Sequence, residues 1–286
     1  MPSERREERN GHRVEKLSIS RRWIAAASSI NRGQNTIHLV AEADITEARR
    51  GMAGHRERTG ERLSLTAYIA ACLARTLSEF PRFNAFRKGR RLVLLDDVTL
   101  NVLFEREIDG ERVPQPVGIH AADRKTYREI HDALRAIQRD RPSHVAAAAG
   151  LEWIGLLPSW LFKLFVRLAA RSVSMQKRYG VVGLTAIGMF GRGAMWPMPL
   201  SSATVSVAVG SIVKRPALNG DEVEEREHLC LTVSFNHDLI DGAPAARFTA
   251  RFVDLLSSGS ELRGAVEGPI EGQHPRERGR PGEEGR

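Results

Sequence analysis

Cysteine is scarce in this sequence, which has only Cys72 and Cys230 among its 286 residues. Two cysteines so far apart exclude a disulfide framework, and they lack the spacing of zinc ligands. Both stand in apolar runs, so we expect two buried free thiols and no metal site. Free thiols also fit a reducing compartment, and we expect the protein to be cytoplasmic.

Long hydrophobic runs are absent as well. No stretch reaches the about 18 uncharged apolar residues that a membrane-spanning helix needs. The first 16 residues contain no apolar centre, so they do not have the pattern of a signal peptide. We therefore expect neither secretion nor a transmembrane helix.

The sequence has an excess of positive charge but no motif for nucleic acid. The net charge is +8, and it belongs to the body, because residues 1–16 hold five basic and four acidic residues and residues 264–286 hold four basic and five acidic. No basic helix is interleaved with aromatic residues, so no nucleic-acid partner is expected. The glycines of residues 180–193 lack the Gly-Lys-Ser/Thr ending of a phosphate loop. A basic body does suit a small phosphorylated ligand.

The most informative stretch is LTVSFNHDLIDGAPAARFTARFVDLL, residues 231–256. An apolar run predicts a strand that ends at Asn236-His237, and a helical pattern with Phe248, Phe252 and Leu255 on one face follows Asp241-Gly242. His237 therefore projects from the end of a buried strand with Asp241 beside it. This pair is a candidate general base with its orienting carboxylate. The alternative is a structural histidine followed by a helix-capping aspartate.

Residues 236–242 (Asn-His-Asp-Leu-Ile-Asp-Gly) resemble the signature of the acyltransferase component of 2-oxo-acid dehydrogenase complexes. That signature is Asp-His-Arg, two variable residues, then Asp-Gly, and the related chloramphenicol acetyltransferases share its His-x-x-x-Asp-Gly core. Here Asn236 and Asp238 replace the flanking Asp and Arg of the family. The following Gly-Ala-x-Ala-Ala-Arg-Phe pattern of residues 242–248 matches as well.

Three further segments are similar to the same family. They are an N-terminal segment with Thr36, His38 and a strand ending in Asp44-Ile45-Thr46, the Pro-x-x-Asn-Ala turn at residues 81–85, and a strand with a glycine loop ending at residues 188–191. In that last segment Thr185 falls at the family's hydroxyl position, which hydrogen-bonds the oxyanion, although Ala186 replaces the usual Asn. The resemblance to chloramphenicol acetyltransferases also makes Arg21 a candidate partner of Asp241. His120, at the end of a predicted strand, fits a structural role better than a catalytic one.

Periodicity and turn residues predict the elements of the chain. Pro114 and Pro116 mark one strand as an irregular strand or an edge strand. We expect helices from near Ser20, from Thr46, over 63–80, over 127–137 and after residue 242, a flexible loop over 51–62 and a hairpin turn at 219–221. We expect strands over 36–44, 91–96, 98–104, 113–119, 203–210 (after a loop from residue 198) and 226–235. The resemblance implies an α/β (α+β, two-layer) coenzyme A-dependent acyltransferase fold, with a mixed β-sheet flanked by helices.

The expected organisation is a disordered tail over 1–16, a catalytic domain over 17–262 and a disordered tail over 263–286. Within the domain, residues 142–178 form an apolar insertion that the complex-forming acyltransferases lack. A helix predicted from Ser159 carries Lys163, Arg167 and Arg171 along one flank. Residues 159–171 could therefore touch a membrane surface, cover an acyl pocket, or pack on the protein's own core or oligomer.

The resemblance implies an acyltransferase that uses coenzyme A or acyl-CoA as a substrate and forms a homotrimer. His237 of one chain would face Thr185 of the next, with Asp241 orienting the histidine. The chain has no lipoyl attachment site, so a free-standing enzyme with a lipoyl-bearing or small-molecule acceptor in trans is expected. The alternatives are a noncatalytic scaffold or binding relative, and a membrane-peripheral enzyme that modifies lipids.

Overall fold

The computed structural model describes residues 33–108, 111–139, 172–188, 193–200 and 203–266, together with isolated shorter pieces of the remaining chain. Its strands are β1 Glu8–Arg9, β2 His12–Arg13, β3 Thr36–Asp44, β4 Ala85–Lys88, β5 Arg91–Leu94, β6 Leu100–Ile108, β7 Glu111–Ile119, β8 Val182–Ala186, β9 Val205–Asn219 and β10 Glu222–Asn236. Its helices are α2 Thr46–Thr59, α3 Leu65–Glu79, α4 Tyr127–Arg139, α6 Val173–Tyr179, α7 Gly242–Ser258 and α8 Arg263–Val266, with 3-10 turns η1 Pro81–Phe83, η2 Ala122–Arg124 and η6 Ser260–Leu262.

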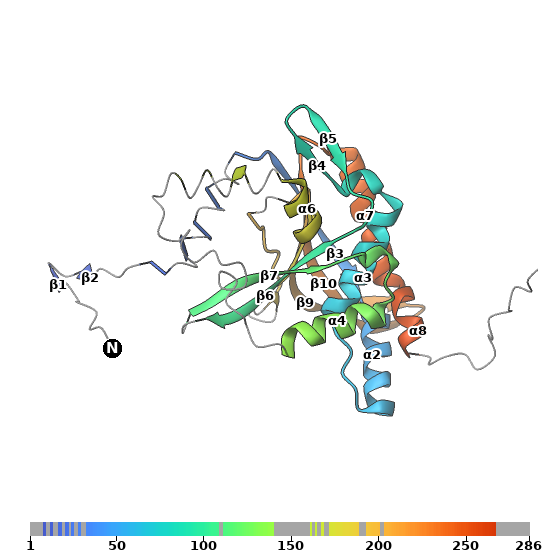
Figure 1. The fold of residues 1–286 in the computed structure, drawn as a ribbon. Coiled ribbons are helices and arrows are strands. Elements are labelled where there is room, and N and C mark those ends of the chain that lie inside the picture. Colours follow the sequence, from blue (N-terminus) through green and yellow to red (C-terminus); the bar gives the residue numbers. More distant parts are fainter. Residues whose placement is uncertain are drawn as a thin grey trace, which may run out of the picture.

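Six strands form one mixed sheet in the order β3-β10-β9-β8-β6-β7 (Figure 1). Strand β8 is parallel to both of its neighbours, β6 and β9, and the other pairs are antiparallel. Strand β7 is an edge strand, which fits its two prolines, because proline has no N–H to donate to a further strand. The predicted mixed sheet flanked by helices is confirmed.

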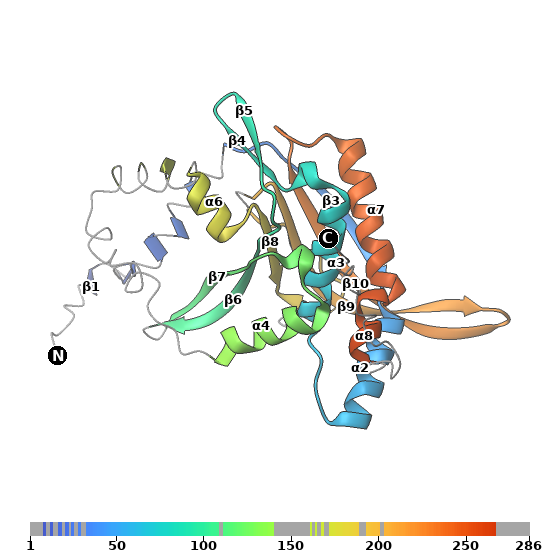
Figure 2. The same cartoon turned by 45° about the vertical axis from the view of Figure 1, so that its right-hand side comes forward.

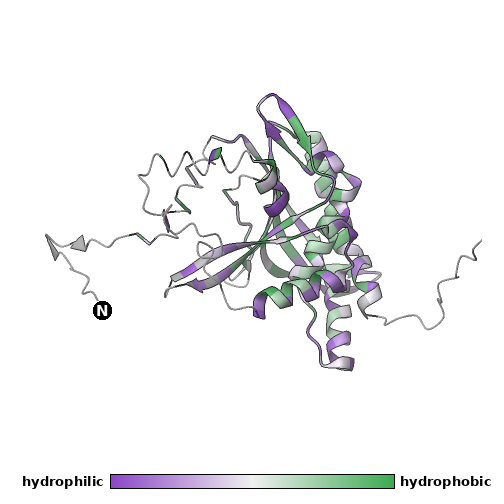
Figure 3. Ribbon diagram, in the orientation of Figure 1, coloured by the Kyte–Doolittle hydropathy of each residue, from purple (hydrophilic) through white to green (hydrophobic). Residues whose placement is uncertain are grey.

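Helices α2, α3, α4 and α7 gather against one face of this sheet (Figures 1 and 2). Helix α3 begins at Ser64, whose side chain accepts the Ala67 N–H at 3.2 Å as an N-cap. The apolar side chains of α3 and α7 meet those of β10 between the layers, and Figure 3 shows that hydrophobic residues concentrate there. Each large side chain buried in this way contributes roughly 1.5–3 kcal/mol to folding, so the core fixes the end of β10 and the start of α7 relative to each other.

Helix α2 contradicts the loop predicted over residues 51–62, because it continues to Thr59 and ends at Gly60 with φ of +76°. The glycine and charge content suggested a loop, but Ala48, Met52 and His55 recur at helical spacing and all three are buried. Packing of this face overrides the weak helix propensity of the glycines.

Most other predicted elements are confirmed, but some boundaries move, and β9 continues nine residues beyond its predicted end at Gly210, to Asn219. Strand β3 has the predicted bounds, and β9 and β10 join at Gly220-Asp221 as the hairpin prediction requires. Strand β10 begins four residues earlier than expected, at Glu222. Strand β4 was not predicted, because its four residues are too few to show a period; it pairs with β5 around Gly89, whose φ is +62°.

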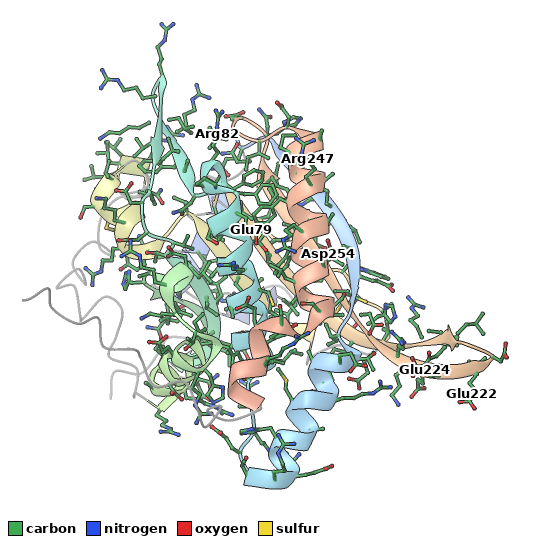
Figure 4. The ribbon with its side chains drawn as sticks, turned by 90° about the vertical axis from the view of Figure 1, so that its right-hand side faces the viewer. Glu79, Arg82, Glu222, Glu224, Arg247 and Asp254 are labelled. Atoms are coloured by element: carbon green, nitrogen blue, oxygen red, sulfur yellow. The ribbon has the colours of Figure 1, made fainter. Side chains whose placement is uncertain are left out.

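The β9–β10 hairpin extends well beyond the helical layer (Figure 2). Ion pairs tie its outer half to β3, with Arg215 2.8 Å from Glu42 and Arg226 2.9 Å from Asp44. The hydrogen bond from Arg215 lowers the pKa of the Glu42 carboxyl. Figure 4 shows Glu224 on this hairpin, whose carboxylate also lies 3.3 Å from Arg50 of α2.

Several predicted segments lie largely outside the described residues. These are the N-terminal tail, residues 142–171 of the predicted insertion over 142–178, and the C-terminal tail beyond residue 266. The end of the insertion is described and belongs to α6. Positions 21, 22, 24, 25, 28 and 29 of the helix predicted near Ser20 are helical, and so are positions 161, 164, 167 and 168 of the insertion. No helix within the described ranges is long and apolar enough to cross a membrane, and those same ranges contain no group of His, Cys, Asp and Glu suited to a metal ion.

Candidate active site

A tight turn joins the buried end of β10 to α7 and carries His237. The N–H groups of Leu239 and Ile240 both donate to the carbonyl of Asn236 at 3.0 Å, and the side chain of Ile240 is buried. The turn therefore closes at once after the strand, and it leaves His237 and Asp241 on the surface of the chain.

Four phenylalanines fix both ends of this turn. Phe235, two residues before His237, lies 5.6 Å from Phe248 of α7 between ring centroids, and Phe83 stacks on Phe248 at 4.8 Å with Phe80 packed at the edge. Such pairs contribute about 0.5–1.5 kcal/mol each beyond their burial. The packing of these rings therefore fixes the position of the turn on the core.

The structure brings His237 and Asp241 together, as the sequence predicts. Nδ1 of His237 lies 3.7 Å from Oδ1 of Asp241, which is longer than a hydrogen bond and forms an ion pair only when the imidazole is protonated. Their side chains are 45% and 86% exposed. Asp241 stands at the N-cap position of α7, yet its side chain makes no capping hydrogen bond. The geometry therefore does not support the alternative in which the Asp241 side chain caps α7.

Thr185 lies near the end of β8, partly buried, and opposite Leu103 on one side and Ala208 on the other. Ala208 in turn pairs with Thr232 of β10, five residues before His237. With a rise of about 3.3 Å per residue and a spacing of about 4.8 Å between strands, Thr185 and His237 of one chain are separated by roughly 15–20 Å. The structure does not bring these two residues together within one chain.

The glycines that follow Thr185 allow a close crossing of backbones. A Cβ atom on Gly188 would lie 1.7 Å from the carbonyl oxygen of Gly210, and one on Gly210 would lie 1.8 Å from that of Met195. Ser211 secures the crossing, because its hydroxyl accepts the Met195 N–H at 2.9 Å. Close backbone packing therefore explains why glycine stands at these two positions, without phosphate binding.

Two other predicted residues stand apart from the turn. The backbone N–H of Arg21 donates to the Ser18 hydroxyl at 3.2 Å, and the ion pairs between described residues include none of Arg21 with Asp241. His120 lies at the end of β7, with Nδ1 3.4 Å from the Thr99 hydroxyl. That contact fits the structural role expected for His120.

A second group of titratable side chains lies where α2, α3 and α4 meet. Glu61 accepts hydrogen bonds from Arg128 at 2.7 Å and from His55 at 3.0 Å, and these bonds lower its pKa to about 2. The Ser64 N–H, at the start of α3, donates to Nδ1 of His131 at 3.1 Å. Burial lowers the pKa of His131, so its acceptor nitrogen stays unprotonated and completes the cap of α3. These hydrogen bonds stabilise the junction of the three helices.

Two residues at the turn were not found from the sequence. Asn35 precedes β3, and its side-chain amide donates to Asp238 at 3.0 Å. Arg87 of β4 donates to the other carboxylate oxygen of Asp238 at 3.2 Å. No short-range pattern connects positions 35, 87 and 238, so only the three-dimensional structure shows this contact.

Comparison with known proteins covers the segment that carries the turn. Residues 170–263, which contain Thr185, His237 and Asp241, match the family model described as 2-oxoacid dehydrogenases acyltransferase (catalytic domain). This part of the chain is therefore similar to that catalytic domain. Over 254 residues the chain is 25% identical to the dihydrolipoyllysine-residue acetyltransferase component of the pyruvate dehydrogenase complex of Acholeplasma laidlawii. The alignment covers 86% of this chain and 41% of that protein, so the chain spans less than half the length of that curated relative.

Solved structures show which fold this chain shares. A probable dihydrolipoamide acetyltransferase from Listeria monocytogenes matches with a TM-score of 0.64 at 18% identity, covering 87% of this chain and 95% of that one. The dihydrolipoamide acetyltransferase of Azotobacter vinelandii matches with a TM-score of 0.62 at 19% identity, covering 89% and 94%. The fold that the sequence resemblance implies is therefore confirmed.

Proposed function

We propose that this protein is an acyltransferase that moves an acyl group between coenzyme A and a thiol or hydroxyl acceptor, with His237 as general base. The observation that carries the proposal is the exposed turn between β10 and α7, which presents His237 with Asp241 at 3.7 Å. The Azotobacter vinelandii structure belongs to a study of a serine, a histidine and an asparagine in a catalytic mechanism, separated by 52 and 4 residues. Thr185, His237 and Asp241 have the same two separations in this chain.

The chemistry follows from these three side chains. The imidazole of His237 removes the proton of the attacking thiol or hydroxyl, whose sulfur or oxygen bonds to the thioester carbonyl carbon. The carbonyl electron pair moves to oxygen, and the Thr185 hydroxyl donates a hydrogen bond to that oxyanion. When the intermediate collapses, the thiolate of coenzyme A leaves and takes the proton back from the imidazolium. Asp241 stabilises the imidazolium while it carries the proton.

A homotrimer is part of the proposal, because Thr185 and His237 of one chain are too far apart to act on one carbon atom. Pairing His237 of one chain with Thr185 of the next resolves this separation and covers the exposed His237 side chain. The acceptor reaches the seam in trans, either on a lipoyl-bearing partner or as a small molecule. A cytoplasmic location remains the expectation from the two thiols.

Replacing His237 with Ala tests the proposal. Turnover of acetyl-CoA and succinyl-CoA with dihydrolipoamide, followed through release of the coenzyme A thiol, should fall by at least about 10²-fold. The variant should unfold at the wild-type temperature, because the side chain is 45% exposed. His120→Ala is the matched control and should keep full activity. A His237→Ala protein with wild-type turnover would refute the role of His237.

A noncatalytic binding protein is the second candidate, and Asn236, Asp238 and Ala186 favour it because each departs from the family pattern. Calorimetric titration with coenzyme A separates the two candidates. Binding without turnover of any acyl-CoA and acceptor pair would support the noncatalytic function, whereas turnover that depends on His237 would exclude it.

A further inference from the structure

The turn that carries His237 is held from outside by two separate elements. The His237 N–H donates to the carbonyl oxygen of Asn35 at 2.7 Å, which extends the β3–β10 ladder by one residue beyond the Asn236–Thr36 pair. The next residue, Asp238, has both carboxylate oxygens engaged, one by Asn35 at 3.0 Å and the other by Arg87 at 3.2 Å. Its own N–H donates to the Asn236 side chain at 3.0 Å.

These bonds join three parts of the chain that are far apart in sequence. Asn35 precedes an edge strand of the main sheet, and Arg87 belongs to β4 of the separate β4–β5 hairpin. Asn35 contacts the turn twice, through its carbonyl to His237 and through its amide to Asp238. Asp238 is therefore the point at which the strand edge, the hairpin and the turn are tied together.

We propose that Asp238, held by Arg87 and Asn35, is a positioning residue that fixes the direction of the His237 side chain. This inference rests on the proposed function. The ion pair lies at the surface, with the Arg87 side chain 59% exposed and that of Asp238 34% exposed. An exposed ion pair adds little to global stability, so its effect should appear in the geometry of the turn. His237 and Asp238 are consecutive residues of one turn. Hydrogen bonds that fix Asp238 therefore limit the backbone rotation that would move the His237 side chain away.

The chain offers a charge-swap test. Arg87→Ala and Asp238→Ala should each lower kcat roughly tenfold with little change in KM or unfolding temperature, because a shift of the base by a fraction of an ångström weakens proton transfer. The double variant Arg87→Asp with Asp238→Arg should recover most of the lost kcat. The amide of Asn35 can turn its oxygen toward the new guanidinium, so all three groups stay bonded.

Arg90→Ala is the matched control. Arg90 lies across Gly89 from Arg87 on the same hairpin, and its replacement should leave kcat unchanged. If Arg87→Ala and Asp238→Ala keep the wild-type kcat, or if the charge swap is as slow as the single variants, the positioning role is overturned.

Amide hydrogen exchange at His237 separates failure of this inference from failure of the proposed function. The His237 N–H is bonded at 2.7 Å and should exchange slowly in the wild type, and severalfold faster in Asp238→Ala and Arg87→Ala but not in Arg90→Ala. This readout works even if the protein turns over no acyl-CoA. Unchanged exchange in both variants would overturn the inference whatever the activity, and faster exchange would support it.

Discussion

Asp241 contributes little to its own chain, and its position is best explained by its neighbour. Its carboxylate is 86% exposed and caps no backbone group of α7, so it gains at most the weak attraction of a carboxylate to a helix N-terminus, about 0.3–1 kcal/mol. The group it approaches is the His237 imidazole. At 3.7 Å the carboxylate attracts a protonated ring but does not hold a neutral one. This geometry suits a group that stabilises an imidazolium formed during a reaction.

Thr185 should act through its hydroxyl alone. Thr185→Ala is expected to lower kcat by about 10²–10³-fold, since a single oxyanion donor contributes that much in comparable sites. Thr185→Ser keeps the hydroxyl and should stay within about tenfold of the wild type. Steady-state kinetics with acetyl-CoA check both variants, and an alanine variant as fast as the serine variant would assign the oxyanion to another donor.

At the scale of elements, the sequence predicts best those helices and strands whose apolar residues repeat regularly over many positions and pack on one face. Alternation predicts β3 to the residue, and the Phe248, Phe252 and Leu255 face predicts α7. The loop predicted over 51–62 was wrong, because the buried face of α2 includes only one large apolar side chain, Met52, and glycines and charged residues surround it in the sequence. Strand β4 has only four residues and becomes visible through its pairing with β5.

The correction of α2 can be tested at Gly54. A Cβ atom there would meet only the end of the Arg58 side chain, at 3.4 Å, and the φ of Gly54 is not positive. In a helix interior Gly54→Ala should therefore raise the free energy of unfolding by about 0.5–1 kcal/mol. Gly210→Ala is the opposite case and should be strongly destabilising, because its Cβ would clash with the Met195 carbonyl. Urea denaturation measures the free energy of unfolding of both variants. A Gly54→Ala variant with wild-type stability would contradict the helix and favour the predicted loop over residues 51–62.

The junction of α2, α3 and α4 should make stability sensitive to acid. Burial lowers the pKa of His131, so the unfolded chain takes up this proton first as the pH falls. The stability contributed by neutral His131 is therefore complete above its ordinary pKa of 6.5 and is lost as the pH falls through the lower folded pKa. Glu61, with its pKa lowered from 4.5 to about 2, adds a second loss between those two values.

His131→Asn isolates the first of these two losses. Asparagine places an acceptor oxygen near the position of Nδ1, so it can still receive the Ser64 N–H but does not titrate. The wild-type unfolding temperature should fall between pH 7.5 and pH 5.5, and the fall should be smaller in His131→Asn. An equal fall in both proteins would show that other groups cause the acid sensitivity.

For the whole molecule, the sequence suggests candidate reacting groups but not their arrangement. Motif resemblance selects His237, Asp241 and Thr185, and the structure places the first two together and the third in another part of the sheet. Their separation follows from strand register, which no local pattern encodes. The contacts of Asn35 and Arg87 with Asp238 also depend on long-range pairing, and for the same reason they could not be predicted.

If the site forms between chains, two inactive variants should restore each other. His237→Ala and Thr185→Ala chains with different tags, coexpressed and purified through both tags, give mixed trimers only. Each mixed trimer then contains one seam with an intact His237 facing an intact Thr185, so activity should return to about one third of the wild type. His237→Ala mixed with Asp241→Ala is the control. Both positions lie on the same turn at 3.7 Å, so no seam is intact and activity should not exceed that of Asp241→Ala alone. Failure of the first pair to recover would place the oxyanion donor and the base within one chain and remove the shared site.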